Sequence, residues 1–266
     1  MTVPLFTVDE SRCQHDAVCV DVCPGYLIQM AGEADLPTPI AGAEDLCTNC
    51  GHCVAACPHG AISLATMAPD DCLPVRADLV PTGAQVGHLL RVRRSIRNYD
   101  PRPIPRELLH QLVDIGRCAP TGSNRQPVKW VVLADTGEVR RLTKLIEAWQ
   151  LAQPDSPARG NLTRGIAAGK DRVCRGAPHI VVAHARKGEE TNGIIALTYL
   201  EVAAHALGLG ACWGGFFNNA ANNLPEVRAA LGIPEGDVCC GSMLLGYPTY
   251  RYQRVPVRNA ARVRWL

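Results

Sequence analysis

"CTNCGHCVAACP", residues 47–58, is the stretch that most constrains the fold of this chain. Its four cysteines follow the spacing C-x2-C-x2-C-x3-C-P, which wraps three thiolates around one 4Fe–4S cluster and sends the fourth to a second cluster. The short intervals let the chain curl around a compact cube, and the proline turns the last cysteine away. Zinc sites also use cysteines two residues apart, but the proline and a second copy of the pattern favour iron–sulfur clusters.

The second copy is RCQHDAVCVDVCP, residues 12–24, and it departs from the first at one ligand position. Its three cysteines each precede a cysteine of the first motif by 34 positions; they are Cys13, Cys19 and Cys23. The position in register with Cys50 holds Asp16 instead, so the segment is an internal repeat with one ligand replaced. We therefore expect Asp16 ligation or an open corner here. The alternative is that water or His15 completes the site, although neither His15 nor His52 falls on a ligand position.

The composition is that of an ordinary globular protein, with 266 residues, 47% hydrophobic and 20% charged. A formal net charge of +2 gives no reason to expect nucleic acid or a membrane as a partner. No apolar run approaches the length of a membrane span, and no secretory signal pattern is visible. Seven of the thirteen cysteines lie between residues 13 and 57, which favours thiolate ligands in a reducing cytoplasm.

The change in residue composition along the chain predicts two domains. Residues 1–70 contain few apolar residues. A small domain with so small a hydrophobic core needs additional stabilisation, such as bound metal. A proline-rich stretch predicts a linker at residues 71–85, and residues 86–266 form the second domain. Of the cysteines beyond the repeat, four lie in apolar stretches and are expected to be small core residues: Cys118, Cys212, Cys239 and Cys240.

Hydrophobic periodicity in the second domain mixes two kinds of element. We expect helices at residues 106–119, 138–151, 192–208 and 220–232, and strands at residues 128–134, 179–185, 211–217 and 238–246. Strands and helices mixed in this way indicate an α+β or α/β domain.

Four stretches of the second domain carry residue types that suit a phosphorylated heterocycle: RRSIRNY (93–99), APTGSNRQPVKW (119–130), GLGACWGGFF (208–217) and LGYPTYRYQRVPVRN (245–259). Guanidinium forks match phosphate oxygens, although an arginine run can also be a solvated face. Amides and hydroxyls in a turn can bind a polar ring edge, and paired glycines let a ligand approach backbone N–H groups.

The N-terminal part, over about residues 7–66, resembles the bacterial two-cluster ferredoxins, in which the fourth cysteine of each motif crosses to the other cluster. The resemblance implies that cluster one is held by Cys13, Cys19 and Cys57, with Asp16 at its remaining corner. It implies that cluster two, a 4Fe–4S cluster, is held by Cys47, Cys50, Cys53 and Cys23. Because carboxylate binds the iron of a sulfide cluster less firmly than thiolate, cluster one is expected to be 4Fe–4S or 3Fe–4S.

The second domain resembles the FMN-dependent nitroreductase superfamily over about residues 86–266, and the whole chain resembles the members with an N-terminal ferredoxin domain. The order of the four stretches carries this resemblance. It implies an α+β fold: a small ferredoxin-like domain, then an FMN domain with a central sheet flanked by helices. It implies FMN contacts from these side chains and backbones: Arg93, Arg94, Ser95, Arg97, Pro120, Thr121, Ser123, Asn124, Gln126, Gly214, Gly215, Arg254 and Arg258.

Among those contacts, Gly214 and Gly215 would offer backbone N–H groups near flavin N5, and the residues from Pro120 to Gln126 often come from the other subunit. The alternative for Arg254 and Arg258 is a charged tail, and Arg258 is the better match to the family's phosphate-binding residues. The chain should thus be a homodimeric, FMN-dependent reductase. Electrons would pass from a donor such as reduced ferredoxin through two clusters and FMN to a small organic acceptor of the nitroaromatic, quinone or activated-alkene type. The alternative is a non-catalytic electron carrier. Residues 151–176 form an insertion that is either a lid over the flavin or a surface loop.

Overall fold

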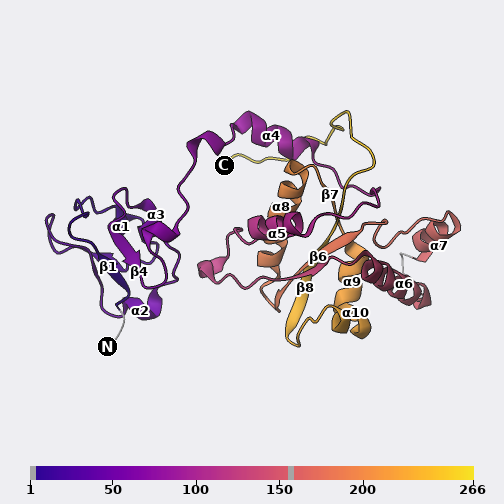
Figure 1. Cartoon of the computed structure of the whole chain (residues 1–266), viewed down its shortest axis with the longest axis horizontal. Helices are drawn as coiled ribbons and strands as arrows, with labels where there is room; N and C mark the ends of the chain where they lie inside the picture. Colours follow the sequence, from indigo (N-terminus) through magenta and orange to yellow (C-terminus); the bar gives the residue numbers. More distant parts are fainter. Residues whose placement is uncertain (1–3, 155–158) are drawn as a thin grey trace. The chain divides into compact units, whose positions relative to one another are not determined.

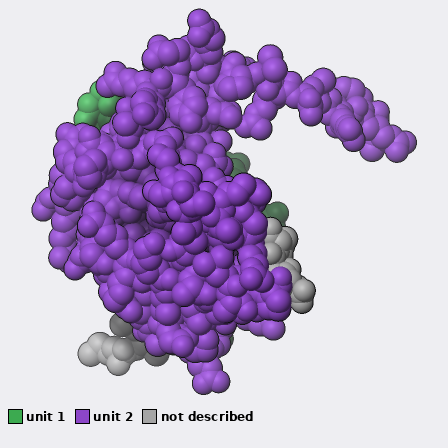
Figure 2. Space-filling view, turned by 90° about the vertical axis from the view of Figure 1, so that its right-hand side faces the viewer, with its two compact units in different colours: residues 1–80, 122–125 green, residues 81–121, 126–266 purple. Residues whose placement is uncertain are grey.

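The computed structural model describes residues 4–154 and 159–266, which form two compact units. The first unit contains the described residues up to Val80 together with Gly122–Arg125, and the second contains Pro81–Thr121 and Gln126–Leu266 (Figures 1 and 2). Among the described residues, no helix combines the length and apolar character that crossing a membrane requires.

The first unit is built from short elements around a small core. They are β1 (Phe6–Val8), α1 (Val18–Asp21), β2 (Ile28–Gln29), β3 (Thr38–Pro39), α2 (Ala43–Leu46), α3 (His52–Ala56), β4 (Ile62–Leu64) and the 3-10 turns η1 (Pro69–Asp71), η2 (Ala77–Leu79) and η3 (Gly122–Asn124). β1 pairs antiparallel with β4, and β2 pairs antiparallel with β3. Phe6, Ile62 and Leu64 are buried together with Cys19 and Cys53, so the cysteines take up much of the interior.

The second unit is a four-stranded antiparallel sheet covered by helices on both faces (Figure 1). Its strands are β5 (Lys129–Leu133), β6 (His179–Arg186), β7 (Gly210–Trp213) and β8 (Asp237–Gly246), in the order β5-β6-β8-β7. Its helices are α4 (Gly83–Val92), α5 (Arg106–Gly116), α6 (Thr136–Ala152), α7 (Arg159–Ala167), α8 (Glu190–Ala206), α9 (Gly215–Asn223) and α10 (Pro225–Ala230).

The two-residue period of the strands divides the core into two halves. Val181 and Met243 face a cluster that includes the leucines of α5 and α8. Their neighbours Val182 and Leu244 face the opposite cluster, which includes side chains of α6, α9 and α10. Both sheet faces are therefore buried, and the α+β fold class expected from the sequence is confirmed.

Most predicted elements of the second unit are present with shifted ends, but two predictions are wrong. The strand predicted at residues 211–217 ends at Trp213, because Gly215–Asn223 forms α9. The helix predicted at residues 220–232 is divided at Pro225, which has no N–H for an intrahelical bond and instead begins α10. Cys118 is exposed, whereas Cys212, Cys239 and Cys240 are buried as predicted.

A buried carboxylate at the start of β8 makes the stability of the second unit depend on pH. The Asp237 side chain is 4% exposed, and its Oδ2 lies 2.9 Å from Lys129 Nζ and 2.7 Å from His184 Nδ1. The Lys129 ammonium, more than His184, lowers the pKa of Asp237 against the opposing effect of burial. Because the folded-state pKa is lowered, this stabilisation is present above the unfolded-state pKa of about 3.9 and is lost as pH falls through the folded value.

We therefore expect Asp237→Asn to lower the free energy of unfolding by about 1–3 kcal/mol at pH 7, and the difference from the wild type to shrink below about pH 4. All four tryptophans lie in the second unit, at positions 130, 149, 213 and 265, so urea unfolding followed by tryptophan fluorescence reports on this unit. If the difference in free energy of unfolding between the wild type and Asp237→Asn stayed constant from pH 7 to pH 3, ionised Asp237 would not be the source of the stabilisation.

Candidate cofactor sites

The 34-residue repeat of the first unit is present in the backbone as well as in the sequence. Left-handed φ values occur at His15 (56°) and at Asn49 (52°), the position 34 residues later. The same spacing relates two further left-handed pairs, which are Ala17 with Gly51 and Tyr26 with Gly60. Short helices begin at Val18 and at His52, again in register. The copy with Asp16 thus has the same local backbone as the copy with Cys50.

Equivalent backbone groups also point at equivalent sulfurs. The Leu27 N–H lies 3.3 Å from Cys23 Sγ, and the Ala61 N–H lies 3.4 Å from Cys57 Sγ. Such N–H groups stabilise a thiolate and tune the cluster it holds. These two cysteines are the ones that the resemblance sends across to the opposite cluster, so the donor chemistry fits a pair of iron–sulfur clusters.

Two further cysteines of the repeat are buried thiols. Burial raises the pKa of Cys19 to about 11, and burial also raises the pKa of Cys53. Thiols of this kind keep their protons until a metal displaces them, because the ligand form is the thiolate. All thirteen cysteines lie in the described residues and none forms a disulfide, so every predicted cysteine ligand can bind iron.

Asp16 lies at the surface beside His59. Its Oδ1 accepts a hydrogen bond of 3.2 Å from the Val18 N–H, and its Oδ2 lies 3.9 Å from His59 Nε2. His15, the rival at this corner, has its Nδ1 3.0 Å from the Asp35 carbonyl oxygen. His59 was not weighed from the sequence, since nothing in the cysteine spacing marks it.

In the second unit, one basic cavity brings Arg97 together with the end of the insertion. The cavity, of about 680 Å³, is lined by Arg97, Lys170, Arg172 and Arg175, with Asn98, Tyr99, Asp171, Thr249 and Tyr250 among the remaining lining residues. Its size is in the range of small-molecule sites. The sequence indicated Arg97 but missed the other three cations, although the basic segment GKDRVCRG at the end of the insertion was a usable signal.

The electrostatics of this cavity suit an anion. Burial, followed by the charges of Arg172 and Arg97, lowers the pKa of Arg175. Arg172 Nε is buried and has no hydrogen-bond partner within the described residues. Asp171, a carboxylate that also lines the cavity, accepts hydrogen bonds within the loop from the backbone N–H groups of Val173, Cys174 and Gly176 at 2.8–3.0 Å. A bound phosphate would relieve the mutual repulsion of the guanidinium groups.

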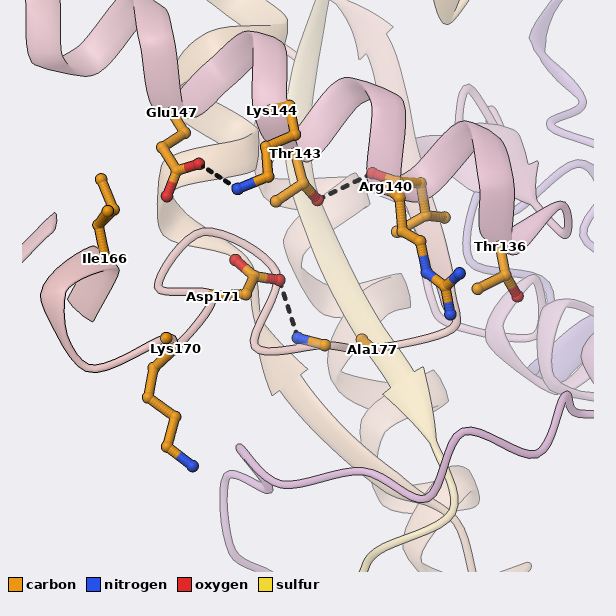
Figure 3. Close-up of a pocket in the computed structure, with 12 residues that line it drawn as sticks. Thr136, Arg140, Thr143, Lys144, Glu147, Ile166, Lys170, Asp171 and Ala177 are labelled. Atoms are coloured by element: carbon orange, nitrogen blue, oxygen red, sulfur yellow. Dashed lines mark hydrogen bonds and ion pairs between the residues drawn. The ribbon is translucent and has the colours of Figure 1, made fainter.

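A second cavity is lined in part by the same loop (Figure 3). It is lined by α6 side chains, including Arg140, Thr143 and Lys144, and it shares Lys170 and Asp171 with the basic cavity. Lys144 is paired with Glu147 at 2.7 Å, and the Thr143 hydroxyl donates to the Val139 carbonyl. The segment 169–176 therefore contributes residues to both cavities. The insertion at residues 151–176, expected to be either a lid or a surface loop, includes residues 155–158, which lie outside the described residues.

The other side chains of RRSIRNY have separate environments. Arg93 Nη1 lies 2.8 Å from Glu201 Oε1, and this carboxylate also accepts from Trp213 Nε1 at 3.3 Å. Arg94 lines a different cavity, with His88, His205 and Tyr250. Ser95 forms an isolated parallel β-bridge with Ala211, a residue of β7. Of the four predicted residues of this motif, the structure thus places only Arg97 in the basic cavity.

The motif APTGSNRQPVKW is divided between the two units. Pro120 is exposed, and Thr121 and Gln126 line a small cavity of the second unit, where Thr121 Oγ1 accepts from the Gln126 N–H at 3.0 Å. Ser123 and Asn124 belong to the first unit. There Asn124 Nδ2 donates to the Asn49 carbonyl at 2.9 Å, within the motif that carries Cys47 and Cys50.

The two glycines after β7 differ in availability. The Gly214 N–H donates to the Ser242 carbonyl at 2.9 Å, and a Cβ at Gly214 would lie 2.7 Å from Ser242 Oγ. Gly214 is therefore needed for close packing. The expectation that its N–H is open to a ligand is wrong. Gly215 is exposed at the first position of α9, where backbone N–H groups have no intrahelical acceptor. Arg254 and Arg258 lie in the exposed C-terminal segment.

Comparison with known proteins follows the same division of the chain. The Nitroreductase family profile matches residues 90–247, and the 4Fe-4S binding domain profile matches residues 43–63. An NADH dehydrogenase of Thermus thermophilus is 30% identical over 191 residues, which covers 63% of this chain and 90% of that protein.

Two solved structures are similar in fold. A nitroreductase with bound FMN from Bacteroides fragilis matches with a TM-score of 0.57 and 24% identity, covering 68% of this chain and 99% of that one. A nitroreductase with bound FMN from Desulfitobacterium hafniense matches with a TM-score of 0.59 and 21% identity, covering 68% and 98%. Since the family profile spans more than half of the chain, this protein belongs to the nitroreductase family of oxidoreductases and carries an N-terminal 4Fe–4S binding domain.

Proposed function

We propose that this chain is an iron–sulfur flavoprotein reductase that passes electrons from an external donor, such as reduced ferredoxin, through two clusters and FMN to an organic acceptor. The acceptor class is nitroaromatic, quinone or activated alkene. Family membership supports the reductase chemistry, and the profile at residues 43–63 supports one cluster. The repeated backbone conformation around His15 and Asn49 supports a second cluster. The clustering of seven of the thirteen cysteines between residues 13 and 57 supports a reducing cytoplasm as its location.

The basic cavity is the observation that carries the FMN assignment. FMN bears a phosphate dianion, and the cavity offers Arg97, Arg172 and Arg175 around one space. The orphaned Arg172 Nε and the lowered pKa of Arg175 both fit an anionic ligand. The similar B. fragilis structure contains FMN. When bound, FMN supplies electron exchange in single steps or in pairs.

The protein's own residues would orient that group. Arg97, Arg172 and Arg175 would hold the phosphate or the anionic edge of the ring, and the free N–H at Gly215 would donate to a ring nitrogen. Arg93 forms an ion pair with Glu201. We therefore propose that Arg93 stabilises the structure around the FMN site. The remaining predicted contacts are proposed as before: Arg94, Ser95, Pro120, Thr121, Ser123, Asn124, Gln126, Arg254 and Arg258.

We propose a homodimer with C2 symmetry. α4 has no buried residue and exposes Val86 and Leu90. The C-terminal segment exposes a further set of large side chains: Tyr250, Tyr252, Val257 and Trp265. An apolar surface of this kind is typical of an interface, and a second copy would cover it. Sedimentation equilibrium of the FMN-loaded protein should give twice the chain mass; a monomer that retains stoichiometric FMN would contradict the dimer.

The reductase proposal is tested on protein purified without oxygen. Extraction should release one FMN per chain, with iron and sulfide for two clusters. Reduced ferredoxin should bleach the flavin faster than NADPH does, and a screen of the three acceptor classes should give turnover with at least one. Zinc without sulfide would contradict the ferredoxin assignment. Full cofactors with no turnover on any acceptor would favour the electron-carrier alternative.

A further inference from the structure

The two halves of the cluster repeat differ at more than the missing cysteine. Asp16 stands in register with Cys50, and His59 stands in register with Gly25, the residue after the first Cys-Pro pair. These two departures, 43 positions apart in the chain, meet in space: His59 Nε2 lies 3.9 Å from Asp16 Oδ2. In the other half of the repeat the equivalent positions hold a cysteine and a glycine, so no such pair can form there.

A third departure holds His59 in place. Arg12 stands in register with Leu46, and its Nε donates to the His59 carbonyl at 2.9 Å. The Arg12 guanidinium also covers the neighbouring Gly60, where a Cβ would lie 2.6 Å from Nη2. The backbone that carries His59 is therefore fixed by a side chain that the other half of the repeat lacks.

We propose that His59 is a positioning residue for Asp16. Its imidazole orients the Asp16 carboxylate toward the one iron of cluster one that has no thiolate ligand. His59 thereby sets the affinity of cluster one for that iron. The inference rests on the ligand set proposed for cluster one. A carboxylate has two oxygens, and a ligating carboxylate is normally hydrogen-bonded by a neighbour that orients it. His59 follows Cys57 by two positions, which keeps it beside the ligand that crosses to this cluster.

The geometry also separates His59 from its rival. His15 is adjacent to Asp16 in the sequence, but its Nδ1 lies 3.0 Å from the Asp35 carbonyl and is used there. The tautomer in which His59 Nε2 carries the proton can donate to Asp16 Oδ2 after a small side-chain movement, because both side chains are partly exposed, at 43% and 36%. Removal of such a supporting partner typically weakens metal binding tenfold to a hundredfold.

The test uses the full-length oxidised protein, purified without oxygen, and ferrous iron as the probe. Low-temperature EPR follows the 3Fe signal as iron is added, and the half-point is the iron concentration at which half the signal is lost. We expect His59→Ala to raise the half-point about tenfold to a hundredfold. His59→Gln keeps an N–H donor and should stay near the wild type. His110→Ala, an exposed histidine on α5, is the matched control and should change nothing.

A double-mutant cycle separates positioning from a general effect on the fold. In an Asp16→Cys background, His59→Ala should have no effect on iron retention, because no carboxylate remains to be held. The inference is overturned if His59→Ala leaves the half-point unchanged, if His59→Gln raises it as much as alanine does, or if His15→Ala raises it instead. A wild-type protein with two iron-tight clusters and no 3Fe signal would instead overturn the ligand set proposed for cluster one.

Discussion

Replacing both Arg97 and Arg175 by alanine is expected to lower the affinity for FMN by roughly a hundredfold to ten-thousandfold. Each arginine contributes a charge-assisted hydrogen bond of about 1.5–3 kcal/mol, and about 1.4 kcal/mol corresponds to a factor of ten. Both side chains line one cavity although they lie 78 positions apart in the chain. Fluorescence titration of the FMN-free protein with FMN measures the loss.

The same variant should not be less stable without FMN. Burial, followed by the charges of Arg172 and Arg97, lowers the pKa of Arg175, so both neighbours oppose the charge on Arg175 when no anion is present. The melting temperature of the FMN-free variant should therefore equal or exceed that of the FMN-free wild type, whereas added FMN should stabilise only the wild type. Arg140→Ala, which changes a residue that lines the second cavity and not the basic one, is the control and should bind FMN normally. Unchanged FMN affinity in the double variant would place the phosphate elsewhere.

Cys50→Ala with Cys53→Ala is expected to remove cluster two and to abolish turnover with reduced ferredoxin. Two of the four proposed thiolates are lost, and a cluster cannot be held by the remaining pair. Iron and sulfide should fall by half, while FMN content and direct chemical reduction of the flavin stay unchanged, because the FMN cavity belongs to the other unit. Turnover with reduced ferredoxin should be lost if the clusters are the only path to FMN, because the single-electron carrier has been removed.

A matched control uses two cysteines with no ligand spacing. Cys118 is exposed on the surface of the second unit and Cys212 is buried beside β8. Cys118→Ala should leave iron, sulfide and turnover as in the wild type, and Cys212→Ala should leave both clusters intact. Full turnover by the Cys50→Ala, Cys53→Ala variant with its donor would show that cluster two is not on the electron path.

The sequence by itself determined the features that depend on short stretches of chain. Cysteine spacing in CTNCGHCVAACP and the 34-residue register of Asp16 with Cys50 are local patterns, and the backbone repeats them at His15 and Asn49. The strands β6 and β8 were predictable because their apolar runs are buried on both faces of a covered sheet, and β5 because it is rich in β-branched and apolar residues. The order of the four motifs led to the nitroreductase family, which the family profile confirms.

Tertiary structure alone decided which distant groups meet. The sequence placed Arg172 and Arg175 only within the insertion at residues 151–176, and the packing of the segment 169–176 beside Arg97 gathers them into one cavity. Gly214 looked like an open backbone donor, but its N–H is taken by Ser242 across the sheet.

The meeting of Asp16 and His59 has the same origin. Spacing along the chain specifies a ligand loop because a few covalent bonds limit where its side chains can reach. Long-range pairs such as Arg97 with Arg175 and Asp16 with His59 are specified instead by burial of the core and pairing of the strands, which depend on many elements of each unit at once.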